Sequence, residues 1–158
     1  MQRSKRAILS GSLGLALSGS LPTSVVHAQE VTIREPWVRG TVHGQKATGA
    51  FMQLTANEPA SLTAVESPVA GSVEIHAMKL ENDIMKMRPV SKLDLPAGKA
   101  VELEPGGYHV MLMDLKQPLK KGEAIPIVLR FEDRDKKVRI IEINAEVREL
   151  AAGPRQKR

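Results

Sequence analysis

Turn-forming residues recur at short, regular intervals between residues 29 and 147, and this spacing constrains the fold more than any other feature. The turn candidates are residues 68–71, 81–83, 96–98, 105–107, 118–122 and 133–135. Between them lie short strand-like segments at 31–34, 37–39, 47–55, 62–66, 72–80, 84–89, 99–104, 108–115, 125–132 and 137–147. Only residues 145–152 allow a short helix. The pattern predicts one all-β domain, an antiparallel sandwich or barrel.

The first 28 residues have the layout of a secretory signal peptide. Three basic residues, Arg3, Lys5 and Arg6, precede an apolar stretch over residues 7–21, and small residues lead to Ala28. That stretch is shorter than the roughly 20 residues that span a bilayer. We therefore expect cleavage after residue 28, a mature protein that does not span the membrane, a folded domain over residues 29–149 and a flexible basic tail over residues 150–158.

The positive charge of the chain lies at its two ends. The formal net charge is +5, of which three charges belong to residues 1–28 and three to the tail. The remaining body is near −1 and has no basic patch with interleaved aromatic residues, so we do not expect nucleic-acid binding. The chain has no cysteine, which excludes disulfides, thiolate metal sites and a lipidated cysteine.

Methionine and histidine are concentrated in one part of the chain. Five of the seven methionines lie between residues 78 and 113, and His76 and His109 lie in or beside the same window. Side chains alternate between the two faces of a strand. The residues that share a face are His109, Met111 and Met113 on one strand, His76 and Met78 with Glu74 on a second, and Met85 and Met87 on a third.

These donors suit copper(I). Thioether sulfur is a soft, neutral ligand that favours Cu(I), and imidazole adds a firmer donor. A zinc site would be expected to use cysteine, carboxylate or more histidine, and a blue-copper site needs a cysteine thiolate. Methionine is also a common gap-filler in protein cores. Composition and strand phase alone leave metal binding and core packing equally open.

The spacing of four of these residues resembles the H-x10-M-x21-H-x-M signature of the periplasmic copper chaperone family PCu(A)C. The four positions are His76, Met87, His109 and Met111. Residues 46–51 and 103–119, together with Trp37, are also similar to that family, and the resemblance covers roughly residues 31–147.

The resemblance implies a cupredoxin-like Greek-key sandwich or barrel that binds one Cu(I) ion through His76, Met87, His109 and Met111. Met78, Met85 and Met113 are auxiliary candidates that could assist transfer or line the site. Some family members hold a second copper ion in a tail rich in histidine and methionine. The tail here has neither residue, so we expect a single site. Residues 57–61 lack an aspartate expected in the family.

The resemblance further implies a monomeric metallochaperone in the periplasm. It would deliver copper to the Cu(A) site of cytochrome c oxidase subunit II, acting beside a Sco-type thiol protein. The alternatives are a periplasmic copper-storage or resistance protein and a metal-free interaction module. An enzyme is not expected, because no catalytic triad, carboxylate pair or phosphate-binding loop is evident.

Three further residues and one turn carry weaker predictions. Trp37 is expected to serve as a core or surface anchor rather than as a shield over copper. Glu74 is either a hydrogen-bond partner of His76 or an ordinary solvent-facing carboxylate. His43 is expected on the surface of a loop. Residues 105–107, Pro-Gly-Gly, predict a tight turn with a glycine at positive φ that aims His109 and Met111.

Overall fold

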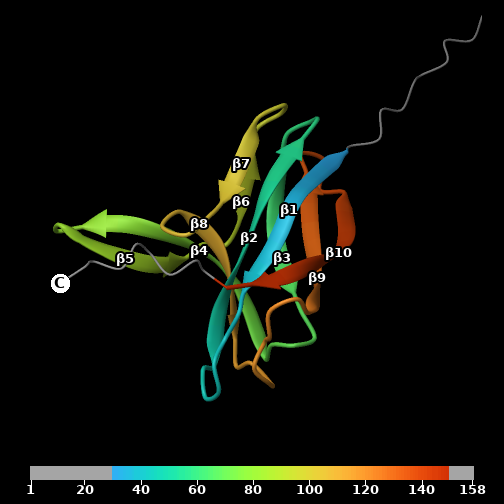
Figure 1. The fold of residues 1–158 in the computed structure, drawn as a ribbon. Coiled ribbons are helices and arrows are strands. Elements are labelled where there is room, and N and C mark those ends of the chain that lie inside the picture. Colours follow the sequence, from blue (N-terminus) through green and yellow to red (C-terminus); the bar gives the residue numbers. More distant parts are fainter. Residues whose placement is uncertain (1–29, 150–158) are drawn as a thin grey trace, which may run out of the picture.

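A computed structural model describes residues 30–149 as a curled sheet of ten strands (Figure 1). The strands are β1 Val31–Arg39, β2 Ala47–Ala56, β3 Ala60–Glu66, β4 Ser72–Glu81, β5 Ile84–Pro89, β6 Leu93–Leu95, β7 Ala100–Leu103, β8 Tyr108–Met113, β9 Ala124–Asp133 and β10 Val138–Arg148. The all-β prediction is confirmed. The predicted signal peptide and tail lie outside the described residues, which contain no helix able to cross a membrane.

The strands follow the order β5-β4-β8-β7-β2-β1-β10-β9-β3-β6, and β2 also pairs with β8. β2 divides its edge between two partners, pairing with β8 through residues 47–50 and with β7 through residues 52–55. The sheet curls so that its β3–β6 end returns against β4 and β2, where Ala56 forms a bridge to Ala97. The result is a half-barrel whose core lies inside the curl. The β4–β5 hairpin projects away from the rest of the sheet (Figure 1).

Three local predictions differ from the structure. Residues 145–148 belong to β10 rather than to a helix, because Ala145 and Val147 are buried on one face of a strand that pairs with β9 and β1. β6 was not predicted, since a strand of three residues carries almost no periodic signal. β1 runs on through Glu35 and Pro36, with a bulge that accommodates one extra residue between Arg34 and Trp37.

The core fills the inside of the curl. Its largest fully buried side chains include Phe131, Leu54, Leu62 and Leu129, from β9, β2 and β3. β8 adds Val110 and Leu112, which are both 0% exposed. Because successive side chains of a strand point to opposite faces, the burial of these two residues turns His109 and Met111 out of the core.

We predict that Leu112→Ala lowers the free energy of unfolding by about 2–5 kcal/mol, because it removes apolar contacts and leaves a cavity. Urea denaturation measures this change. Leu80→Ala is the matched control, since the same atoms are removed from a side chain that is 64% exposed, and it should cost less than about 0.5 kcal/mol. Equal losses in the two variants would contradict the assigned core.

Candidate metal centre

The three segments that carry the soft donors are neighbouring strands, in the order β5-β4-β8. Across β4 and β8, His76 lies directly opposite His109. Across β4 and β5, Met78 lies directly opposite Met87. Residues that face each other across antiparallel strands share a face of the sheet, so the pairing register gathers the donors on the face that the core does not use.

A pocket of about 230 Å³ opens on this face. It is lined by Met78, Met87, His109 and Met111, together with Arg39, Gly49, Phe51, Pro105 and Gly106. This volume is below the usual range of organic-ligand pockets but ample for an ion.

Three of the four predicted ligands therefore line one pocket. The fourth, His76, lies beside it, with its ring centroid 5.8 Å from that of His109. Met78, an auxiliary candidate, lines the pocket as well. Met85 and Met113 do not. Met85 lies two cross-strand pairs beyond Met87, opposite Leu80, and Met113 lies opposite Ser72.

His109 is held in a defined orientation by the turn that precedes it. Its Nδ1 atom lies 3.0 Å from the Gly107 carbonyl oxygen. A carbonyl only accepts hydrogen bonds, so Nδ1 carries the proton and Nε2 of the neutral ring has a free lone pair. Nε2 is buried and has no hydrogen-bond partner among the described residues. Gly106 has the φ of 91° that the predicted turn requires.

His76 is oriented in the same manner by a carboxylate. Its Nε2 lies 2.7 Å from Oε2 of Glu74, so Nε2–H donates, and in the neutral ring Nδ1 retains the lone pair. Nδ1 is buried and has no hydrogen-bond partner within residues 30–149. Of the two roles considered for Glu74, the structure shows the contact with His76. Each imidazole thus has one nitrogen fixed by an acceptor and one nitrogen free to bind a metal.

Aromatic rings support the inner side of the pocket. Phe51 lies between Trp37 and His109, with ring centroids 4.4 Å and 6.5 Å away respectively. A Cβ atom on Gly49 would approach Cζ of Phe51 to 2.6 Å, so this position must be glycine for the ring to lie where it does. Trp37 packs against Phe51 and does not line the pocket, which agrees with an anchoring role.

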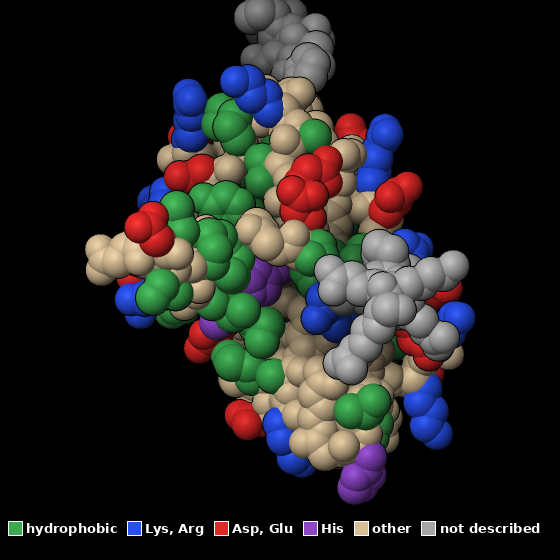
Figure 2. All heavy atoms as spheres, turned by 60° about the vertical axis from the view of Figure 1, so that its left-hand side comes forward, with side chains coloured by type: hydrophobic (Ala, Val, Ile, Leu, Met, Phe, Trp, Pro, Cys, Tyr) green, Lys and Arg blue, Asp and Glu red, His purple; other side chains and the backbone are tan. Residues whose placement is uncertain are grey.

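The outer side of the pocket is more open. His76 and His109 are 9% and 5% exposed, whereas Met87 is 46% exposed. Figure 2 shows histidine atoms partly covered within a broad apolar surface. Because the thioethers are the more exposed donors, an ion would reach the buried imidazoles past them. On the other face of the β4–β5 hairpin, the Arg88 guanidinium holds the pKa of the Glu81 carboxyl below its ordinary value.

Arg39 is a site residue that the sequence analysis did not identify. It is the last residue of β1, it lines the donor pocket, and its Nε atom is buried without a hydrogen-bond partner in the described part of the chain. In the sequence, the only sign of this role is that Arg39 lies two residues after Trp37 and therefore shares a face of the strand with it. Its position depends on β1 lying beside β2, and β2 beside β8.

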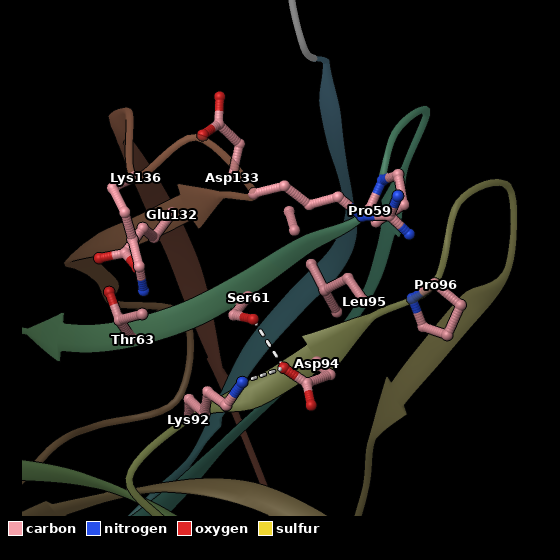
Figure 3. Close-up of a pocket in the computed structure, with 12 residues that line it drawn as sticks. Pro59, Ser61, Thr63, Lys92, Asp94, Leu95, Pro96, Glu132, Asp133 and Lys136 are labelled. Carbon is pink, nitrogen blue, oxygen red and sulfur yellow. Dashed lines mark hydrogen bonds and ion pairs between the residues drawn. The ribbon is translucent and has the colours of Figure 1, made fainter.

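A hollow elsewhere in the described structure offers no comparable set of donors. A second hollow lies between β3, β6 and the end of β9 (Figure 3). There Asp94 already accepts a hydrogen bond from Ser61 and pairs with Lys92, and Glu132 pairs with Lys136. His43 is exposed in the loop after β1, as expected. Residues 30–149 contain no group of three or more His, Asp or Glu side chains able to hold a metal ion.

Residues 31–143 match the family model described as "Putative lipoprotein LpqE-like". The chain is 35% identical to "Putative lipoprotein Lxx21020" of Leifsonia xyli subsp. xyli over 130 residues, covering 80% of this chain and 78% of the relative.

Solved structures extend the comparison. The copper-bound PCuAC domain from PmoF2 has a TM-score of 0.61 at 25% identity, covering 78% of this chain and 97% of that domain. The Cu(I) form of DR1885 from Deinococcus radiodurans has a TM-score of 0.53 at 30% identity, covering 84% and 82%. The cupredoxin-like fold implied by the resemblance is confirmed.

We predict that, in the metal-free protein, the neutral ring of His109 carries its proton on Nδ1 and the neutral ring of His76 carries its proton on Nε2. Long-range ¹H–¹⁵N correlation spectra of the imidazoles distinguish the two tautomers. Glu74→Ala removes the acceptor of His76 and should lead that ring to exchange between tautomers, while His109 serves as the internal control and stays unchanged. A wild-type His76 with its proton on Nδ1 would contradict the assigned donor atoms.

Proposed function

The chain belongs to the LpqE-like family, and we propose that it is a periplasmic metallochaperone that binds one Cu(I) ion. The observation that carries the proposal is a pair of buried imidazole nitrogens without hydrogen-bond partners among the described residues. One belongs to His109, which lines the small thioether pocket, and the other to His76, whose ring lies beside that of His109. Unpartnered buried polar atoms cost free energy, and a metal ion is the ligand that uses such lone pairs directly. Copper is also what the similar PmoF2 and DR1885 structures contain.

The donor set favours the monovalent state. We propose His76, Met87, His109 and Met111 as the ligands, with Met78 able to join or replace one thioether because it lines the same pocket. These groups are neutral and soft, which suits Cu(I) better than harder, more highly charged ions. With both imidazoles bound to metal, the site offers no free base or nucleophile, so we propose a carrier rather than an enzyme.

The geometry also suits release. Thioethers are weak ligands, and the exposed Met87 gives an incoming protein access to one side of the ion. We propose that the copper passes to the Cu(A) site of cytochrome c oxidase subunit II, with a Sco-type thiol protein acting beside the chaperone. The protein is proposed to act as a monomer and without nucleic acid.

The proposed location is the periplasm. The family and the Leifsonia relative bear lipoprotein names, as expected of exported, envelope-associated proteins. The 158 residues contain no cysteine that could carry a lipid. We therefore propose that residues 1–28 act as a cleaved signal peptide, that residues 29–149 form the copper-binding domain, and that residues 150–158 remain a basic tail.

We predict that the protein binds Cu(I) with 1:1 stoichiometry and that His109→Ala or Met111→Ala weakens binding at least roughly tenfold, since each removes a donor; tenfold corresponds to about 1.4 kcal/mol. Competition with a chromogenic Cu(I) chelator measures the affinity. The matched controls are His43→Ala and Met113→Ala, which remove the same residue types outside the pocket and should leave the affinity unchanged. Unchanged affinity in the first two variants would overturn the ligand assignment.

A second prediction separates delivery from storage. When the Cu(I)-loaded protein is mixed with an apo Cu(A) domain under reducing conditions, we expect copper to move to that domain, because the thioether ligands bind weakly and Met87 is exposed. Adding oxidant afterwards then gives the absorption of the mixed-valence Cu(A) centre. Copper that stays on the donor protein, with or without a Sco-type protein, would support the storage alternative instead.

A further inference from the structure

Arg39 places a positive charge in the wall of the donor pocket that nothing in the described structure neutralises. It forms no ion pair and no side-chain hydrogen bond within residues 30–149, and its Nε atom is buried. Its register partner on β10 is Arg148, another cation, whose own side chain is paired with Glu146. Partly buried charges are normally paired, so an unpaired guanidinium at this position calls for an explanation.

The groups around Arg39 do not offset its charge. The pocket presents thioethers from Met78, Met87 and Met111 and an imidazole from His109, all of which are neutral as ligands. Glu74 is the carboxylate in contact with a predicted ligand, but it is bound to Nε2 of His76, and its side chain is 48% exposed. Solvent screens such a charge more than one in the pocket wall.

We propose that Arg39 is a selectivity residue that sets the oxidation state of the bound copper. This inference rests on the proposed function. A guanidinium in the pocket wall repels any cation, and the repulsion is twice as large for Cu(II) as for Cu(I). The soft donors favour Cu(I) through bonding, and Arg39 adds an electrostatic penalty that falls mainly on Cu(II). The two effects act independently, so the charge can be removed while every ligand stays in place.

The test compares Cu(I) and Cu(II) affinities of the wild type, Arg39→Gln, Arg39→Lys and Arg130→Gln, each measured by chelator competition. Arg39→Gln keeps much of the side-chain length but removes the charge, and Arg39→Lys keeps the charge. Arg130→Gln removes the same charge from an exposed position on β9, outside the pocket. Far-UV circular dichroism and urea denaturation verify that each variant is folded.

In Arg39→Gln we expect tighter binding of both ions and a larger gain for Cu(II). The ratio of the Cu(II) to the Cu(I) dissociation constant should fall roughly tenfold or more, the size expected for one unit charge in the wall of a partly buried site. The reduction potential of the bound copper should fall in parallel. Arg39→Lys and Arg130→Gln should retain the wild-type ratio.

Glu74→Gln supplies an independent variant, because it removes a negative charge and should shift the same ratio in the opposite direction by a smaller factor. A ratio that is unchanged in Arg39→Gln, or that falls equally in Arg39→Lys, would overturn the charge-selectivity proposal while leaving copper binding intact. A wild-type protein that binds no Cu(I) would instead defeat the proposed function itself.

Discussion

The two-sided environment of β8 is the constraint on which the rest of the site depends. Val110 and Leu112 are buried in the core on one face, and their burial fixes the phase of the strand. A slip of one residue would place His109 and Met111 in the core and expose two large aliphatic side chains. The burial of Val110 and Leu112 therefore positions His109 and Met111.

Pairing then converts one well-placed strand into a site. β4 sets His76 opposite His109, β5 adds Met87 opposite Met78, and β2 contributes Gly49, whose missing side chain leaves room for Phe51. Backbone hydrogen bonds define these registers with little tolerance. A pocket assembled from five neighbouring strands is therefore more rigid than one built on loops.

Hydrogen bonding decides which imidazole nitrogens of His76 and His109 are available to bind a metal ion. The Gly107 carbonyl and the Glu74 carboxylate each occupy one imidazole nitrogen, and the other nitrogen is left buried and unpartnered. Two unsatisfied polar atoms and an unpaired guanidinium therefore lie in one small region, where they raise the free energy of the metal-free protein. Such concentrations of unsatisfied groups are expected where a ligand binds, because the binding free energy offsets their cost.

The sequence by itself determined the all-β class, nearly all of the strands, the shared phase of the donors and, through the spacing of His76, Met87, His109 and Met111, the resemblance to copper chaperones. Alternation and turn chemistry are local properties, so they can be recognised without a structure. Only the tertiary structure decided that Met78 lines the pocket while Met85 and Met113 do not, which nitrogen of each imidazole is free, and that Arg39 lies beside the donors. These features depend on the register between strands distant in the chain, and local periodicity does not encode that register.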